Sequence, residues 1–401
     1  MADGTARYSL FFFFTYPSVN KMNLTGGSPT TLPSGKVSLD EHPKIFCAGD
    51  VHGDFLALLR VLKMTGVARV LDHVMAAVEI CPADQIGRKI NPLAADEMRS
   101  IAWTGGRNAL LLLGDVLDNR RGGKDDPYGV CGFAGTQTQM MELLQQLATT
   151  ARRAGGKLVW VLGNHDCGNA MGGNRHFCER YAPQWHTRPG TTGDKVPSVY
   201  ATCNAHGFSD DHVRHVQDAL LKMRSVAVVN IHSPSTGHSV IALHGGITKT
   251  SMTFLTSRVM GKYRLRKQDS PDVNITRLNS LFHDAHSGDP AATQIVNHHS
   301  DKMPTWCRPS SIEDPHTFEA LFGTTRMIKA HDVQERGANC GMGHQRKTSG
   351  TAAMMNNELC RVDAGMSRCF AKYVPRRNIA FVELWVDSAD LMRRVHNYTY
   401  D

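Results

Sequence analysis

Short apolar runs followed at once by polar residues recur along the chain and predict strands with a functional edge. Five such runs occupy residues 45–48, 109–113, 158–162, 239–243 and 326–329. Continuous apolar runs of this length are typical of strands that are buried on both faces. Residues just beyond the ends of strands build the sites of open α/β sheets, so a functional site is expected directly after these five runs.

Helical periodicity lies between the predicted strands. Asp54 is a candidate N-cap for a helix whose apolar positions are Phe55, Leu58, Leu59 and Leu62. A second helix is predicted over residues 137–153, where Gly155-Gly156 ends it. Because strands and helices alternate with short connections, we expect parallel strand pairing. Further strands are expected near residues 226–231, 238–243, 326–330, 359–363 and 378–386.

Three stretches interrupt this regular pattern. Residues 1–41 have the Gly, Pro, Ser and Thr content of a loop or tail, so we expect an N-terminal extension followed by one domain over residues 42–401. A run of four phenylalanines at 11–14 favours packing, either as an edge strand or against a partner. Residues 167–224 and 251–322 are expected to be insertions that form a cap. The second contains a basic run at Arg258, Lys262, Arg264, Arg266 and Lys267.

Composition limits the class of protein. A hydrophobic fraction of 41% in 401 residues is ample for a globular core, and the formal charge of +8 suits an anionic substrate, nucleic acid or an acidic protein partner. The basic run is read first as a solvated face and second as the element that selects an acidic substrate. The apolar stretch near the N-terminus is too short to span a bilayer, so a soluble, intracellular and cytoplasmic protein is expected. The ten scattered cysteines are interpreted mostly as reduced core thiols, most clearly Cys47.

The residues that follow the five runs form a set of potential metal ligands. The strings are GDVHG at 49–53, GDVLD at 114–118, GNHD at 163–166, LHGG at 243–246 and AHD at 330–332. Two divalent ions can activate water and neutralise phosphate oxygens, and they need mixed oxygen and nitrogen ligands. Asp50 and His52 are two residues apart, so an extended backbone would direct both to one side. Each string alone fits a helix cap or a turn, but the five in order favour a phosphoester hydrolase.

The series resembles the calcineurin-like metallophosphoesterases and, within them, the phosphoprotein phosphatase superfamily. The family pattern of GDxHG, GDxxD, GNH[ED], HGG and a final Ala/Gly-His is matched across residues 49–331. The chain is most similar to the Shewanella-like, or bacterial-type, branch on the strings at 164–172, 306–308 and 361–367. The resemblance implies a central two-sheet β-sandwich flanked by helices, in an α/β (α+β) fold. Alternation of strands and helices alone would indicate only α/β.

The resemblance also implies a role for each matched residue. Two divalent ions (Mn, Fe or Zn) would be held by Asp50, His52, Asp115, Asn164, His244 and His331, with Asp115 as the bridging ligand. His165 would be the general acid, oriented by Asp118. Arg308 would clamp phosphate oxygens. The usual Asp-Arg-Gly is interrupted by Asn119, so either Arg120 or Arg121 would make the second arginine contact.

The implied function is that of a metallophosphoesterase, a phosphoric monoester hydrolase that acts on protein substrates. A metal-bound hydroxide would attack phosphoserine or phosphothreonine directly, with phosphotyrosine as the next substrate. The implied partner is a phosphorylated protein, and neither nucleic acid nor a membrane is required. Two alternatives remain open: a diadenosine-tetraphosphatase-like nucleotide hydrolase, and a binding or structural protein that keeps the fold without catalysis.

Other histidines and cysteines offer weaker candidates for a second metal site. The group His176, Cys178, His186, Cys203 and His206 lacks the Cys-x2-Cys spacing of usual structural zinc sites. The pairs His298-His299 and His283/His286 are interpreted as surface or loop residues.

Overall fold

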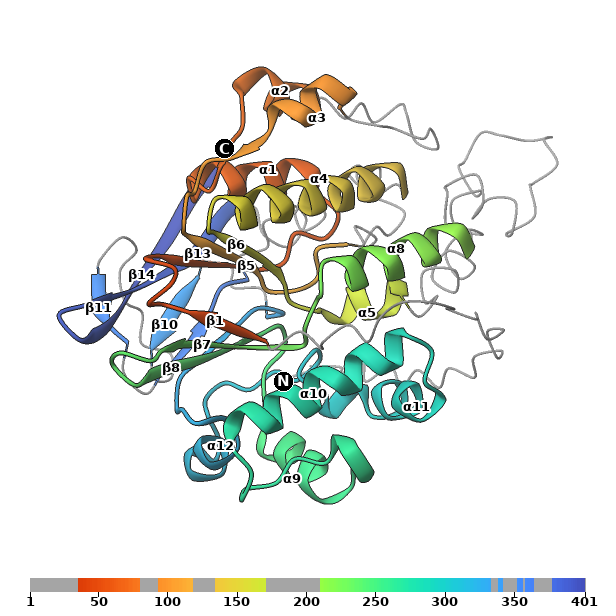
Figure 1. Cartoon of the computed structure of the whole chain (residues 1–401), viewed down its shortest axis with the longest axis vertical. Helices are drawn as coiled ribbons and strands as arrows, with labels where there is room; N and C mark the ends of the chain where they lie inside the picture. Colours follow the sequence, from red (N-terminus) through yellow and green to blue (C-terminus); the bar gives the residue numbers. More distant parts are fainter. Residues whose placement is uncertain are drawn as a thin grey trace, which may run out of the picture.

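Two six-stranded sheets lie against each other between two groups of helices in the computed structural model of the chain (Figure 1). The structure describes residues 35–79, 93–117, 134–170, 210–332, 338–341, 352–355, 358–363 and 377–400. Within this part of the chain, the predicted two-sheet α/β architecture is confirmed.

The first sheet combines strands from the middle and the end of the chain. Its order is β1 (Lys36–Ser38), β7 (Val228–Ser233), β8 (His238–Leu243), β9 (Met327–Lys329), β12 (Leu359–Arg361) and β10 (Asn339–Gly341). β8, β9 and β12 are mutually parallel, whereas β7 and β8 form an antiparallel hairpin. β1 lies in the stretch that the sequence assigns to the N-terminal extension, and it pairs in parallel with β7.

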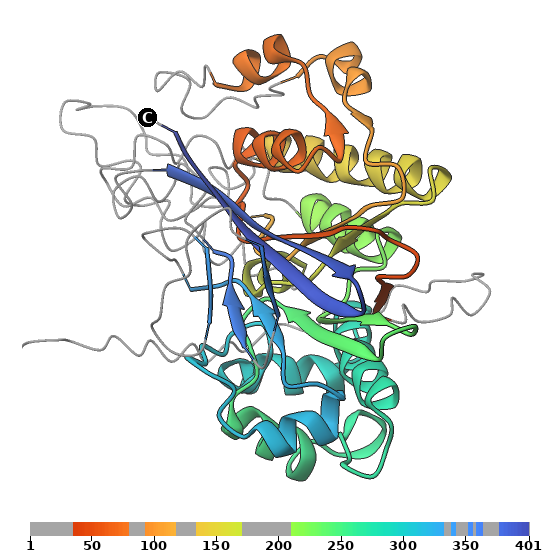
Figure 2. The same ribbon diagram turned by 90° about the vertical axis from the view of Figure 1, so that its left-hand side faces the viewer.

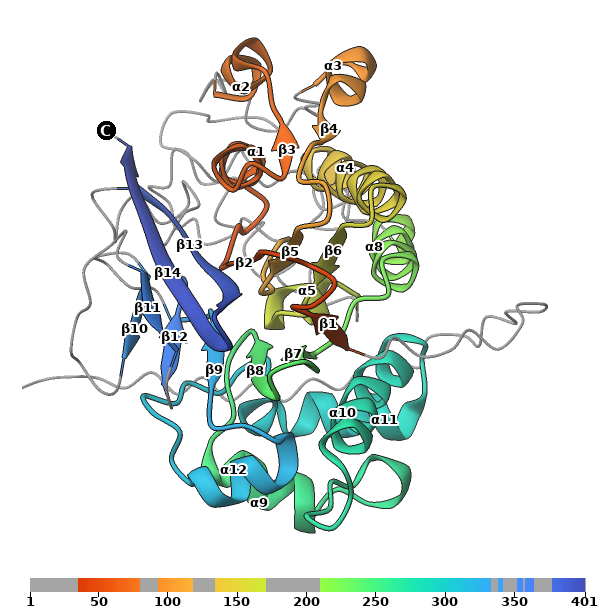
Figure 3. The same ribbon diagram turned by 60° about the vertical axis from the view of Figure 1, so that its left-hand side comes forward.

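The second sheet holds three predicted strands in parallel. Its order is β11 (Ala352–Met354), β14 (Asp390–Tyr400), β13 (Arg377–Asp387), β2 (Ile45–Ala48), β5 (Ala109–Leu112) and β6 (Lys157–Trp160). Ile45 pairs with Ala109, and Ala109 pairs in turn with Lys157. The parallel pairing predicted for these runs is therefore confirmed. Figure 3 shows β2, β5 and β6 of this sheet above β7, β8 and β9 of the first. A small separate sheet joins β3 (Ala68–Arg69) to β4 (Ala102–Trp103).

Helices cover the outer face of each sheet (Figure 1). On the side of β5 and β6 lie α1 (Phe55–Met64), α2 (Asp72–Glu79), α3 (Ala95–Ser100), α4 (Ala134–Arg153), α5 (Asn164–Ala170) and α8 (Asp210–Lys222). The second predicted insertion lies on the side of β7 and β8. It forms α9 (Lys249–Ser257), η3 (Gly261–Tyr263), α10 (Pro271–His286), α11 (Pro290–His298), η4 (Ser300–Lys302) and α12 (Pro315–Phe322). Among the described residues, none of the helices is both long and apolar enough to cross a membrane.

The first helix forms for the reasons that the sequence suggested. The Asp54 carboxylate accepts hydrogen bonds from the backbone N–H groups of Leu56 (3.1 Å) and Ala57 (3.3 Å), which are otherwise unpaired at a helix start. The apolar positions at helical spacing are all buried against the core. The helix predicted over residues 137–153 is also confirmed, because α4 ends at Arg153.

The last two strands form a long hairpin that the sequence analysis only half predicted. β13 and β14 pair over eleven residues, and Figure 2 shows them as two long antiparallel ribbons. Their turn is made by Ser388 (φ 50°) and Ala389 (φ 74°), which take a left-handed conformation without glycine. Because the usual Asn-Gly or Asp-Gly signal is missing, local sequence did not mark the hairpin.

The cysteines that the structure describes divide into two groups. Cys47, Cys167 and Cys307 are free and buried, as the sequence analysis expected. Cys340 and Cys360 face each other on β10 and β12 and form a disulfide, so this pair is an exception to the reduced thiols expected for most of the cysteines. The pairing depends on strand register, which residue spacing alone does not reveal.

Candidate metal centre

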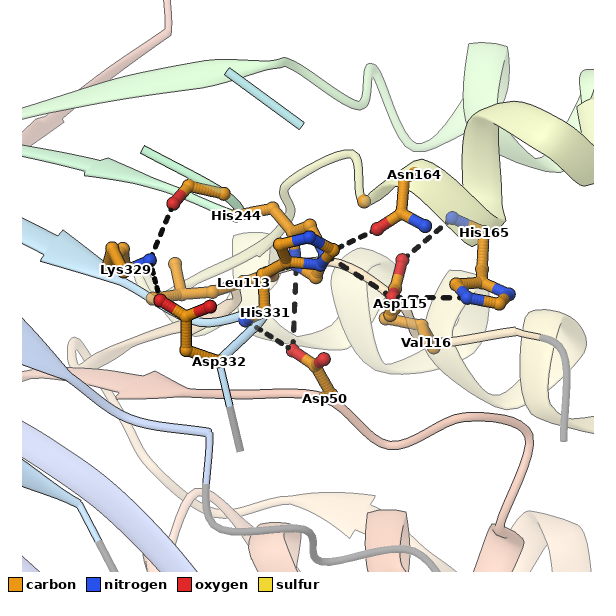
Figure 4. Close-up of polar contacts among 12 residues, drawn as sticks. Asp50, Leu113, Asp115, Val116, Asn164, His165, His244, Lys329, His331 and Asp332 are labelled. Carbon is orange, nitrogen blue, oxygen red and sulfur yellow. Dashed lines mark hydrogen bonds and ion pairs between the residues drawn. The ribbon is translucent and has the colours of Figure 1, made fainter. Parts of the chain in front are cut away.

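Five loops bring the predicted ligands from the ends of strands to one point. Asp50 and His52 follow β2, Asp115 follows β5, and Asn164 begins α5 directly after β6. His244 follows β8, and His331 follows β9. All six side chains are buried, and they come from both sheets. Figure 4 shows Asp50, Asp115, Asn164, His244 and His331 as one connected polar group.

The motif glycines allow the loops to meet. A Cβ atom on Gly114 would lie 2.6 Å from the backbone of Gly163. On Gly163 it would lie 2.1 Å from the backbone nitrogen of Asp115, well inside any tolerated contact. Side chains at either position would separate the loop that carries Asp115 from the loop that carries Asn164.

Three of the six predicted ligands have a left-handed backbone. The φ angles are 49° at His52, 47° at Asp115 and 68° at His331. Such angles are uncommon outside glycine and cost about 1–2 kcal/mol each, and strained residues concentrate at functional sites. The extended backbone expected for residues 50–52 is therefore wrong. The turn at His52, rather than a two-residue strand period, brings its imidazole to Asp50.

His244 organises one half of the cluster. Its Nδ1 lies 2.7 Å from the carbonyl oxygen of Leu113, a contact in which Nδ1–H is the donor. Its Nε2 then presents a lone pair, yet it lies 3.0 Å from Asn164 Oδ1, 3.0 Å from His331 Nδ1 and 3.3 Å from Asp115 Oδ2 (Figure 4). Electron-rich atoms that face one another in this way require a cation or a proton between them.

Asp115 joins this half to the other. Its Oδ1 accepts a hydrogen bond from the backbone N–H of His165 (2.8 Å). Its Oδ2 is buried and accepts no backbone N–H or hydroxyl hydrogen bond among the described residues, so only a protonated imidazole or a cation could satisfy it. The imidazole Nε2 atoms of His52 (3.7 Å) and His165 (3.9 Å) also lie near Oδ2. His52 Nε2 is in turn 3.5 Å from Asp50 Oδ2.

These contacts fit a pair of metal ions. Ligand atoms of His52, Asp115 and His165 lie within 4.8 Å of one another, and so do those of Asp115, His244 and His331. The first group contains His165, the predicted general acid, whereas the predicted ligand Asp50 approaches it through His52 (3.5 Å). Asp115 belongs to both groups, as a bridging carboxylate would. A buried carboxylate oxygen without a partner is costly, and a cation would remove that cost. The mixed carboxylate and imidazole donors suit Zn, Fe or Mn.

The pKa values in the cluster also indicate a demand for positive charge. Burial disfavours the charged form of His244, but the carboxylates of Asp115 and Asp50 outweigh burial and raise its pKa to about 9. Burial acts against ionised Asp115 as well, but His244, His165 and His52 hold its pKa well below the usual value. For His331, burial followed by His244 lowers the pKa. Without metal, a proton on His244 would replace part of the missing charge.

Asp166 ties the two central loops together. Its Oδ1 accepts hydrogen bonds from the backbone N–H groups of Val116 and Leu117 (both 3.1 Å). Its Oδ2 accepts from Trp160 Nε1 (3.1 Å) and from the backbone N–H of Gly163 (3.0 Å). Burial, followed by the charge of Asp115, raises the pKa of Asp166 to about 6. Asp166 belongs to the GNHD string, but no role was predicted for it from the sequence.

The remaining predicted residues differ in how the structure places them. The His165 side chain is 18% exposed, and its ring lies edge-on to that of His52 with centroids 4.9 Å apart. Arg308 is 58% exposed and lies 3.4 Å from Asp332, from Nε to Oδ1. Asp118, Arg120 and Arg121 lie outside the described residues, as does the weak zinc group at 176–206.

The first three residues of the late motif at 361–367 are described by the structure, and they lie next to the candidate metal centre. A Cβ atom on Gly49 would lie 2.9 Å from the Cα of Asp363, so the start of this motif packs against the loop that carries Asp50. Asp363 is fully buried. By contrast, the histidines of α10 and α11 join neither described His/Asp group. His286 is buried in α10, so its interpretation as a surface or loop residue is wrong, and burial lowers its pKa to about 4.

Comparisons with known proteins found similar chains among protein phosphatases. The chain is 23% identical over 301 residues to Shewanella-like protein phosphatase 2 of Arabidopsis thaliana, a match over 68% of this chain and 66% of the relative, just under two thirds of its length. A cold-active protein-tyrosine phosphatase of a psychrophilic Shewanella species is similar with a TM-score of 0.49 and 15% identity, over 92% of this chain and 83% of that chain. A protein serine/threonine phosphatase of Saccharomyces cerevisiae is similar with a TM-score of 0.42 and 11% identity, over 92% of this chain and 85% of that chain.

The chain matches a family model over most of its length. The model of the calcineurin-like phosphoesterases matches residues 43–315, which is more than half of the chain and includes four of the five motif strings. The family recognised in the sequence is thereby confirmed, and with it membership of a class of hydrolases. The chain belongs to the calcineurin-like phosphoesterase family.

Proposed function

We propose that this protein is a metal-dependent phosphomonoesterase that removes phosphate from proteins, with phosphoserine and phosphothreonine ahead of phosphotyrosine. One observation carries the proposal. Asp115 Oδ2 is buried, accepts no backbone N–H or hydroxyl hydrogen bond among the described residues, and faces imidazole nitrogens from His52, His165 and His244. A site that only stabilised the fold would pair such an oxygen with N–H groups, as Asp166 is paired a few ångströms away.

In this proposal the six buried ligands hold two divalent ions of Mn, Fe or Zn. Asp50, His52 and Asp115 serve one ion, and Asp115, Asn164, His244 and His331 serve the other. Bound there, the ions would supply an activated water and positive charge for the phosphate oxygens. The protein contributes rigidity, because the loops are fixed by close glycine contacts and by the hydrogen bonds of Asp166.

His165 is assigned the proton transfer to the leaving oxygen. Its backbone N–H is held by Asp115 Oδ1, which fixes the start of α5, while its partly exposed ring remains accessible to a substrate. Asp118 is proposed as the residue that orients this ring. Arg308, with Arg120 or Arg121, is proposed to bind the phosphate oxygens. The name of the Arabidopsis relative, a protein phosphatase, supports a phosphoprotein rather than a nucleotide as substrate.

A reconstitution assay tests the proposal. The full chain is stripped with a chelator, loaded separately with Mn, Fe or Zn, and assayed on an aryl phosphate. We expect activity only in loaded protein, and a loss of about 10²–10⁴-fold in kcat for His165→Ala, as for removal of a general acid. His298→Ala, an exposed histidine on α11, is the matched control and should keep full activity.

A substrate panel then separates the alternatives. Peptides with phosphoserine, phosphothreonine or phosphotyrosine are compared with a dinucleoside polyphosphate at equal concentration. Faster hydrolysis of the dinucleoside polyphosphate would mean that the enzyme is a nucleotide hydrolase and not a protein phosphatase. Loaded wild type that is no faster than His165→Ala on every substrate would refute catalysis and leave a binding role.

A further inference from the structure

A buried lysine lies beside the candidate metal centre and takes no part in it. Lys329 is the last residue of β9, two residues before His331, and its side chain is fully buried. Its Nζ donates to the carbonyl oxygen of Gly245 (2.8 Å) and to the carboxylate of Asp332 (Figure 4). A buried ammonium needs such a partner, since an unpaired charge in the core is strongly destabilising.

Asp332 connects this buried charge to the surface. One oxygen, Oδ2, meets Lys329, whereas the other, Oδ1, lies 3.4 Å from Nε of Arg308. The Asp332 side chain is only 22% exposed. Because Lys329 holds one oxygen in the core, the direction of the other is fixed. One carboxylate thus lies between two cations, and these three side chains together carry more positive than negative charge, which suits a phosphate group.

The loop that carries Arg308 is itself held against the metal centre. The backbone N–H groups of Gly245 and Gly246 both donate to the carbonyl oxygen of Pro304 (2.7 and 3.0 Å). Further along this loop, the ring of Trp306 lies edge-on to His331, with centroids 5.7 Å apart. The base of Arg308 is therefore fixed, while its exposed side chain has freedom to adopt other directions.

The form of the ion pair matters for binding. Asp332 approaches the guanidinium at Nε, which leaves the two terminal amino groups free to bind two phosphate oxygens side by side. An arginine restrained at Nε loses less conformational entropy when it binds an anion, so the restraint improves affinity without a contact of its own.

We propose that Asp332 is a positioning residue that directs Arg308 toward the substrate phosphate, and that buried Lys329 fixes Asp332 for this purpose. The inference rests on the proposed function and deepens it, because it assigns the strength of phosphate binding to a residue that touches neither metal nor substrate. The affinity for every phosphomonoester depends on Asp332 in the same proportion, whatever the leaving group.

A double-mutant cycle on the metal-loaded full chain tests this role. Asp332→Asn, Arg308→Ala and the double variant are compared in kcat and KM on an aryl phosphate and in the calorimetric Kd for inorganic phosphate. We expect Asp332→Asn to raise KM and Kd about fivefold to tenfold at nearly unchanged kcat. The double variant should bind phosphate as Arg308→Ala does, because Asp332 acts only through that arginine.

Two further variants keep the test informative if Asp332→Asn folds poorly. Asp332→Glu retains a carboxylate for Lys329 but shifts the oxygen that meets Arg308, so it should keep stability and metal content and still weaken phosphate binding. Arg308→Lys keeps the charge but lacks Nε–H, so a subsequent Asp332→Asn change should have little effect.

The outcomes separate the two proposals. The role of Asp332 would be overturned if the two substitutions multiplied their effects on KM and Kd in the double variant. It would also be overturned if Asp332→Asn lost bound metal without a change in KM. In both cases, activity of the wild type would leave the proposed function standing. A wild type that neither hydrolyses the aryl phosphate nor binds phosphate would overturn both.

Discussion

Replacement of Asp166 by asparagine should destabilise the protein strongly, although the two side chains have nearly the same shape. Asp166 is fully buried and accepts four N–H groups, two at each oxygen. An asparagine has one acceptor oxygen, so in either orientation two of these donors face an NH₂ group. Each buried donor left unpaired costs about 1–3 kcal/mol, which gives about 2–6 kcal/mol for two.

Relaxation of the loops reduces the upper end of this range, and we expect the free energy of unfolding to fall by about 3 kcal/mol. That is a large share of the roughly 5–15 kcal/mol by which native proteins are stable. The affinity for metal should fall as well, by about 10–100-fold, because the hydrogen bonds of Asp166 hold the residues next to Asp115 and Asn164.

The assay is urea unfolding of the metal-free protein, followed by metal titration of the folded variant. Asp211→Asn is the matched control, since this aspartate lies exposed on α8 with an ion pair to Arg214. It should change stability by less than about 0.5 kcal/mol. An equally small effect of Asp166→Asn would refute the reasoning, because it would mean that the four contacts contribute no net stability.

Two further predictions concern loop approach and acid stability. Gly163→Ala should abolish metal binding, because its Cβ would collide with the backbone of Asp115. Gly168→Ala in α5 is the control and should leave metal content unchanged, because a Cβ at that position meets nothing. Metal content is measured in both variants, and full occupancy in Gly163→Ala would contradict the loop contact. The pKa of Glu383 is lowered to about 2 by its hydrogen bond from His396, with help from Lys44. Its contribution to stability is therefore complete above the ordinary pKa of 4.5 and lost as pH falls toward about 2. Urea midpoints measured against pH should converge for wild type and Glu383→Gln at the acid end, and a constant difference would refute the assignment.

Local patterns of apolar and polar residues predicted much of the fold. The apolar runs at 45–48, 109–113 and 158–162 became parallel strands because apolar side chains on both faces can only be buried inside a layered sheet. The helix after Asp54 followed from a cap and a periodicity that are both encoded within ten residues. The hairpin at Ser388 and Ala389 was missed because its turn uses residues without a turn signal.

The sequence alone selected the side chains that the structure brings together at the candidate centre, since each candidate ligand follows directly on a run that must become a strand. Their order along the chain was enough to recognise the family. Only the tertiary structure decided how the loops meet: the left-handed backbone at His52, the contact of Gly114 with Gly163, and the pairing of Cys340 with Cys360. Only the tertiary structure revealed the four hydrogen bonds of Asp166 as well. The same holds for the two ion pairs that connect Lys329 through Asp332 to Arg308. These features join residues far apart in sequence or depend on loop geometry, so the local preferences of the chain do not predict them.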